Sequence, residues 1–149
     1  MKILVIGGNS YIGEHLIKDL SSNKKFQISS ISRNLPSVNK RIDFVDYINI
    51  DVLHDFNSLK EHLNNAKVII NLIGEIKNES MMKRTNFFFL KKLVDYIINL
   101  DLNLHLIQIS SVGVYGAINR KSREINFINE KSYLNPNNLY EKTKRDADE

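Results

Sequence analysis

The stretch Gly7-Gly8-Asn9-Ser10-Tyr11-Ile12-Gly13 is the most informative segment of this chain of 149 residues for its fold. It follows the short apolar run Ile3 to Ile6 and leads into residues 11–21, whose apolar side chains recur at helical spacing. A glycine-rich turn between a buried strand and a helix lets backbone amides approach phosphate, which also meets the positive end of the helix dipole. The stretch therefore predicts a phosphate-binding turn, and the alternative is a turn that only connects strand to helix.

Outward from this turn, strand patterns alternate with helix patterns. We predict strands at Phe26–Ile31, Phe44–Ile50, Val68–Ile73 and Leu104–Ile109, and helices at 56–64 (with Asp55 as N-cap), 80–100 and from Leu139 onward. This alternation predicts an α/β fold with a doubly wound parallel sheet in the strand order 3-2-1-4-5. Residues 116–138 are polar and irregular. Because the chain stops within its last helix, we expect a truncated fragment of a larger protein.

Composition narrows the class of protein. The chain is 42% hydrophobic and 26% charged, has no cysteine, and carries a net charge of +4 spread over scattered pairs. No apolar stretch approaches the roughly 18 residues of a membrane span, and the N-terminal apolar run is too short for a signal peptide. We expect a cytoplasmic protein that binds neither membrane nor nucleic acid, and no metal site, because the four histidines lack ligand spacing.

The residues after the second strand bear on the choice of dinucleotide. Ser32-Arg33 stands where an acidic residue would hydrogen-bond a free ribose 2′-hydroxyl. A guanidinium suits a 2′-phosphate instead, because it makes charge-assisted and often bidentate contacts. The sequence therefore favours NADP, with NAD as the alternative if Arg33 is only a surface residue.

Five further segments accompany the turn in a fixed order. They are Asp51-Val52, Asn71-Leu72-Ile73-Gly74, Asn86, Ser110-Ser111-Val112-Gly113-Val114-Tyr115-Gly116 and Tyr140-Glu141-Lys142-Thr143-Lys144. Over its whole length the chain resembles the extended short-chain dehydrogenase/reductase family, in its NAD(P)-dependent epimerase/dehydratase group. The resemblance implies that residues 1–149 form an NAD(P)-binding Rossmann domain without its C-terminal substrate-binding part. With Arg33 included, the expected cofactor-binding residues are Gly7, Asn9, Ser10, Tyr11, Ile12, Gly13, Arg33, Asp51, Val52, Leu72, Ile73, Gly74, Asn86, Tyr140 and Lys144.

The same resemblance assigns three catalytic residues, Ser111, Tyr140 and Lys144. Tyr140 would be the general acid/base on a substrate hydroxyl or carbonyl, and Ser111 would hydrogen-bond the reacting oxygen. Lys144, four residues after Tyr140 and thus on the same helical face, would stabilise phenolate and hold the nicotinamide ribose. The YxxxK pattern alone is common by chance, so its weight comes from the serine segment and the glycine turn before it.

The residues beside Ser111 narrow the reaction. Related sugar-nucleotide dehydratases carry Asp-Glu directly after the catalytic serine or threonine, whereas Val112-Gly113 has no ionisable group. We therefore expect 4-epimerisation or keto-sugar reduction of a nucleoside-diphosphate sugar, and no activity from the fragment alone. The alternative is a non-catalytic subunit that binds NADPH structurally, since Val68 to Gly74 is similar to such atypical relatives. The catalytic trio favours the enzyme.

The helix predicted at 80–100 also suggests a partner. Its expected buried stripe comprises Phe87, Leu90, Val94, Ile97 and Ile98. Phe88 and Phe89 would widen the apolar surface beyond what one sheet covers. Because the family dimerises through this helix and the one with the YxxxK motif, we expect a homodimer through residues 80–100 and 139–149.

Overall fold

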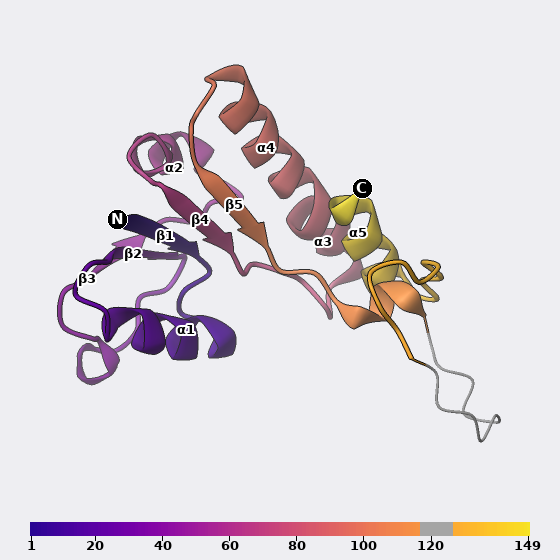
Figure 1. Ribbon diagram of the computed structural model, residues 1–149, viewed down its shortest axis with the longest axis horizontal. Helices are drawn as coiled ribbons and strands as arrows, with labels where there is room; N and C mark the ends of the chain where they lie inside the picture. The colour runs from indigo at the N-terminus through magenta and orange to yellow at the C-terminus, as the bar shows by residue number, and fades with distance from the viewer. Residues whose placement is uncertain (117–126) are drawn as a thin grey trace. The chain divides into compact units, whose positions relative to one another are not determined.

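The computed structural model describes residues 1–116 and 127–149, which divide into two compact units (Figure 1). The first comprises Met1–Ile73 and Tyr96–Ile109, and the second comprises Gly74–Asp95 and Ser110–Glu149. Part of the segment predicted to be irregular, residues 117–126, lies outside the described residues, and residues 127–138 contain no helix or strand. In the ranges that are described, no helix is both long and apolar enough to cross a membrane.

The first unit is built on a five-stranded parallel sheet in the order β3-β2-β1-β4-β5. The strands are β1 (Lys2–Ile6), β2 (Gln27–Ser32), β3 (Val45–Asn49), β4 (Val68–Asn71) and β5 (His105–Gln108). Ile6 pairs with Ile31 of β2 and with Asn71 of β4, so these three strands end at the same edge. The predicted order is confirmed, and the predicted strand ends differ from the observed ones by at most two residues.

Two helices of this unit lie on opposite faces of the sheet (Figure 1). Ile17 of α1 (Tyr11–Ser21) packs on one face with Ile3, Val5 and other buried aliphatic side chains. Because successive side chains of a strand alternate, Leu4 and Ile6 point to the other face, the face of α2 (Phe56–Leu63). Asp55 caps α2 as predicted, by accepting a hydrogen bond from the Ser58 amide. A single 3-10 turn, η1 (Val38–Lys40), lies between β2 and β3.

The helix predicted at 80–100 has the expected extent but is not uniform. It consists of α3 (Glu79–Lys83), a π-helical turn η2 (Arg84–Phe88) and α4 (Phe89–Asn99). A π-helical turn inserts extra backbone into a helix and occurs often at functional sites. The second unit also contains the 3-10 turn η3 (Val112–Tyr115) and α5 (Leu139–Asp148), whose start at Leu139 was predicted.

The predicted buried stripe of this helix is wrong in part. Phe89 is only 4% exposed and Leu93 is fully buried, whereas Ile98 is 69% exposed and Phe88 is 52% exposed. The run Phe87-Phe88-Phe89-Leu90 is continuously apolar, so it does not define which face of a helix is buried. The π-helical turn also changes the rotation per residue, which periodicity at 3.6 residues per turn does not include. The exposed apolar surface of this helix therefore includes Phe88 and excludes Phe89.

Candidate functional site

Close backbone contacts shape the glycine turn between β1 and α1. Gly7 has a φ of +87°, and its amide donates a 2.8 Å hydrogen bond to the Ile31 carbonyl. A Cβ atom on Gly8 would lie 2.2 Å from Ser30 Oγ, and one on Gly13 would lie 2.5 Å from the Gly8 carbonyl oxygen. A side chain would be strained by the backbone conformation at Gly7, and at Gly8 and Gly13 it would collide with neighbouring atoms. The role of Gly8 was not anticipated from the sequence.

The first turn of α1 presents unused backbone donors. Ser10, which stands where a stricter motif has glycine, is the N-cap and accepts a 3.1 Å hydrogen bond from the Gly13 amide. Among the described residues, no acceptor takes the amide hydrogens of Tyr11 and Ile12, and both residues are exposed. These donors and the positive end of the helix dipole form a site that suits a phosphate group.

The end of β2 holds this turn in place. The Ser32 hydroxyl accepts a 2.9 Å hydrogen bond from the Asn9 amide, and the Asn9 side chain donates a 3.0 Å hydrogen bond to the Asn34 carbonyl. Arg33, which lies between Ser32 and Asn34 in the sequence, has an exposed side chain. On the side of β4, a Cβ atom on Gly7 would come within 3.0 Å of Ile73, so these two predicted cofactor residues are adjacent.

Asp51 follows β3 and is an ionised carboxylate with protein partners. It accepts a 3.1 Å hydrogen bond from the Leu53 amide and lies 3.0 Å from Nδ1 of His54. Partial burial alone would raise the pKa of Asp51. The hydrogen bonds from His54 and Leu53 and the positive charges of His54 and Arg33 outweigh this effect and lower the pKa. The same pKa shift indicates that Arg33 acts on Asp51 through its charge.

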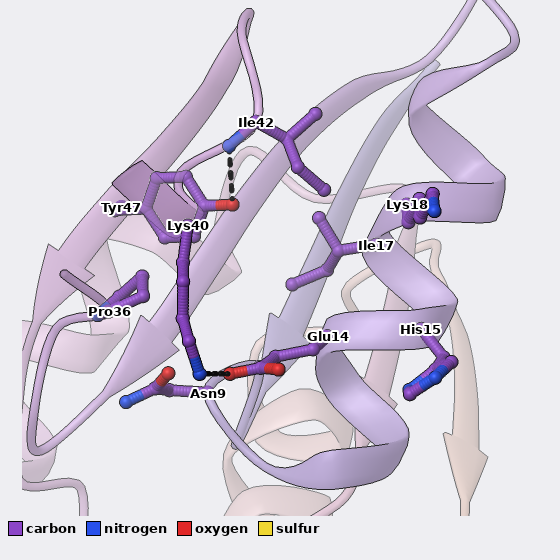
Figure 2. A pocket seen from close by; sticks show the side chains of 10 residues that line it. Asn9, Glu14, His15, Ile17, Lys18, Pro36, Lys40, Ile42 and Tyr47 are labelled. Carbon is purple, nitrogen blue, oxygen red and sulfur yellow. Dashed lines mark hydrogen bonds and ion pairs between the residues drawn. The ribbon is translucent and has the colours of Figure 1, made fainter. Parts of the chain in front are cut away.

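A cavity of about 280 Å³ lies between α1 and the connection from β2 to β3 (Figure 2). Its lining includes Ile17, Ile42 and Pro36, and it reaches the phosphate turn at Gly8 and Asn9. Two of its polar side chains already have partners. Lys40 lies 3.8 Å from Glu14, and the Tyr47 hydroxyl accepts a 3.1 Å hydrogen bond from the Ile42 amide. We therefore assign no chemistry to this cavity.

In the second unit, the serine segment packs on the start of α5. Ser111 is the N-cap of η3, and its hydroxyl accepts a 3.2 Å hydrogen bond from the Gly113 amide. A Cβ atom on Gly113 would lie 2.9 Å from Cγ of Glu141, whose carboxylate completes the capping box of α5 with Asn138. Gly116, with a φ of +83°, approaches the Asn135 carbonyl more closely still, so a Cβ atom there would collide with the carbonyl oxygen. The turn that carries Ser111 therefore contacts the helix that carries Tyr140.

Lys144 is buried in α5, one turn after the partly exposed Tyr140. It is 4% exposed, and a Cβ atom on Gly74 would lie 3.5 Å from its Nζ. Burial lowers the pKa of Lys144, and the negative charge of Asp148 opposes this effect in part. Asp148 in turn accepts a hydrogen bond from the Ser110 hydroxyl. Gly74 and Lys144, both predicted from the sequence, thus come together.

The side chain of Asn86, in the π-helical turn, is used by the protein itself. Its Oδ1 accepts a 2.8 Å hydrogen bond from the Glu75 amide, and its Nδ2 donates to the Glu75 carbonyl at 3.0 Å. Nδ2 also donates to Oγ1 of Thr143 at 2.9 Å. Sequence reasoning missed Thr143, although it lies within the YxxxK segment, because a threonine in a helix has no signal that reveals a distant partner.

Comparison with known proteins agrees with this geometry. The family model described as "NAD dependent epimerase/dehydratase family" matches residues 3–149. The chain belongs to this family. The resemblance noted from the sequence is therefore confirmed, and so is the Rossmann-type sheet.

Solved structures of the family share this fold. One is a dTDP-glucose 4,6-dehydratase from Bacillus anthracis in complex with NAD, with 23% identity and a TM-score of 0.81 over 99% of this chain and 48% of that chain. Another is a UDP-glucuronic acid 4-epimerase from Bacillus cereus in complex with UDP-glucuronic acid and NAD, with 22% identity and a TM-score of 0.80 over 99% and 50%. The present chain thus spans about half the length of these proteins.

The buried Lys144 predicts a pH-dependent stability. Its pKa in the folded chain is below the ordinary value of 10.5, so between these two values the unfolded chain holds a proton that the folded chain lacks. Unfolding then takes up a proton, and the free energy of unfolding rises with pH in this window, by at most about 1.4 kcal/mol per pH unit. Chemical denaturation across the alkaline range measures this rise.

The Lys144→Met variant should lose this rise, because it removes the titrating group. Lys142→Met, at an exposed position of the same helix, is the matched control and should keep it. The same pH dependence in the wild type and in Lys144→Met would contradict the prediction.

Proposed function

We propose that this chain is the dinucleotide-binding part of an NAD(P)-dependent oxidoreductase or epimerase that acts on a nucleoside-diphosphate sugar. The observation that carries this proposal is the buried Lys144 with its lowered pKa, four residues after Tyr140 on one face of α5. Burying an ammonium group is costly, and a buried lysine whose pKa is lowered, beside a second ionisable group, is typical of active sites. Family membership supports the same conclusion.

The residues of the phosphate turn fit a dinucleotide. The free amides of Tyr11 and Ile12 point out of the positive end of α1, which is where a pyrophosphate binds in doubly wound folds. Asp51 and Val52 would contact the adenine, and Leu72 to Gly74 would line the site at the end of β4. When bound, the dinucleotide supplies the hydride acceptor and donor.

The protein's own residues supply the acid–base chemistry. Tyr140 takes a proton from the substrate hydroxyl as its carbon is oxidised and returns a proton on reduction. Lys144, one turn further along the same face of α5, supplies a positive charge to this proton transfer and holds the nicotinamide ribose. Ser111 donates its hydroxyl hydrogen to the reacting oxygen, while its own oxygen is held by the Gly113 amide.

The turn beside Ser111 favours epimerisation or reduction over dehydration. Water loss needs an additional acid and base, and neither Val112 nor Gly113 can ionise. A side chain at position 113 would also collide with Glu141, which is required for the cap of α5. Solved relatives include a UDP-glucuronic acid 4-epimerase and a UDP-glucose 4-epimerase.

Arg33 supports a preference for NADP. Its exposed guanidinium follows β2 directly, and no carboxylate occupies the position that would bind a ribose 2′-hydroxyl. Solved relatives hold NAD, so NAD is the competing cofactor.

We further propose that the protein is a homodimer through the helices at 80–100 and 139–149. The exposed ring of Phe88 supports this assembly, since a large apolar side chain on a helix surface is stabilised by burial.

Removing the Tyr140 hydroxyl tests the proposed reaction. In the protein that carries this chain, Tyr140→Phe should lower turnover of UDP-glucose, UDP-glucuronic acid or dTDP-glucose by about 10²- to 10⁴-fold, because the proton has no acceptor. NADH affinity, measured by fluorescence, should be retained, since the ring remains. Tyr133→Phe, at an exposed position of the same unit, is the control. Unchanged turnover in Tyr140→Phe would overturn the catalytic assignment.

Removing Arg33 tests the cofactor preference. Arg33→Ala should weaken NADPH binding by about 10- to 100-fold, because a charge-assisted contact to the 2′-phosphate is lost, and should leave NADH binding nearly unchanged. Fluorescence titrations with both cofactors measure this, with Lys24→Ala, at an exposed position in the turn before β2, as the control. An equal loss for NADPH and NADH would remove the argument for the 2′-phosphate.

A further inference from the structure

Thr143 stands between the two residues of α5 that the proposed function uses most. It directly precedes Lys144 and follows Tyr140 by three residues, and it is 2% exposed. Its hydroxyl donates a 2.8 Å hydrogen bond to the Tyr140 carbonyl and accepts a 2.9 Å hydrogen bond from Nδ2 of Asn86. One hydroxyl group thus joins α5 to the π-helical turn η2, which is 57 residues away in the sequence.

The direction of these hydrogen bonds follows from the groups involved. An amide NH₂ only donates and a carbonyl only accepts, so the hydroxyl must accept from Asn86 and donate to Tyr140. Among side chains of this size, only serine and threonine can do both. Valine has the same shape and can do neither, and it would leave one buried hydrogen of Asn86 without its acceptor.

Local helix stability does not explain why a threonine occupies position 143. A hydroxyl that bonds back to the carbonyl of the preceding turn competes with the helix backbone and slightly destabilises the helix. A β-branched side chain also lowers helix propensity. The stabilisation that the Thr143 hydroxyl provides must therefore come from its hydrogen bond to Asn86. Asn86 is only 2% exposed, so solvent does not replace a hydrogen-bond partner that is lost.

The far end of this network reaches the surroundings of the Lys144 amine. Asn86 holds both the amide and the carbonyl of Glu75, which directly follows Gly74. A Cβ atom on Gly74 would lie 3.5 Å from Nζ of Lys144 and 3.6 Å from Oδ1 of Asn86. The same network thus fixes the helix that carries Lys144 and the backbone that faces its amine.

We propose that Thr143 is a positioning residue, whose hydroxyl locks the turn of α5 that carries Tyr140 and Lys144 onto Asn86 and so keeps the Lys144 amine buried beside Gly74. The catalytic consequence rests on the proposed function, but the positioning of Lys144 does not. Thr143 touches no substrate atom in this assignment and acts only through its neighbours.

The test compares Thr143→Val with Thr143→Ser in the chain of 149 residues. Titration of the lysine Cε resonances by NMR, with Lys144 assigned from Lys144→Met, reports the pKa of Lys144 directly. In Thr143→Val the pKa should rise toward its ordinary value, because the amine gains water. In Thr143→Ser it should stay lowered as in the wild type, since the hydroxyl remains. Circular dichroism confirms that each variant is folded.

A folded Thr143→Val variant whose Lys144 titrates as in the wild type would overturn the proposal. If the valine variant does not fold, Thr143→Ala replaces it, since the space left by the removed atoms can admit a water molecule beside Asn86. It must then show the same rise in the pKa of Lys144. An unchanged Lys144 titration in the folded alanine variant would equally overturn the proposal.

Turnover separates this proposal from the proposed function. In the protein that carries this chain, Thr143→Val should lose about 10- to 100-fold in kcat through misplacement of the catalytic side chains, and Thr143→Ser should restore most of it. If Lys144 responds as expected while Tyr140→Phe keeps full turnover, the positioning role stands and the catalytic assignment falls. If Tyr140→Phe is inactive and the pKa of Lys144 does not change in Thr143→Val, the catalytic assignment stands and the positioning role falls.

Discussion

The close approach of the first turn of α1 to the backbone at the end of β1 is the constraint on which the first unit depends. Gly13 lies against the Gly8 carbonyl, and Gly8 lies against Ser30 of the neighbouring strand, with no room for a Cβ atom at either position. Because of these contacts, α1 begins directly at the carboxyl edge of the sheet. The free amides of Tyr11 and Ile12 then lie where β1, β2 and β4 end. A longer connection would separate the helix dipole from that edge.

The second unit depends on a different constraint, which is the burial and the position of the Lys144 amine. Burial of Lys144 costs free energy, and the negative charge of Asp148 offsets this cost in part. A polar network centred on the buried residues Asn86 and Thr143 holds the surrounding backbone. Asn86 is central to that network, since it bonds to both backbone groups of Glu75 and to Thr143. The π-helical turn that carries Asn86 is a local departure from regular helix geometry beside the proposed site, and such turns often occur at functional sites.

The cap at Asp55 and the start of α5 could be predicted because each depends on neighbouring residues in the sequence. The strand order could be predicted because the alternation of strands and helices restricts how parallel strands connect. The buried face of α4 could not be predicted, because four consecutive apolar residues do not show which side of the helix is buried. A π-helical turn also departs from the regular period of 3.6 residues per turn. Gly8 and Thr143 were missed for another reason. Their roles depend on Ser30 and Asn86, and these partners become visible only when distant segments are brought together.

An amide NMR titration of the chain with NADH and NADPH tests whether residues 7–13 form a dinucleotide site. The amide resonances of Tyr11 and Ile12 should shift most, because these donors have no acceptor among the described residues. Resonances of Ile42 and Tyr47, which line the cavity behind α1, should move little. Shifts confined to that cavity, or none at either place with cofactor in large excess, would rule out a dinucleotide site at residues 7–13.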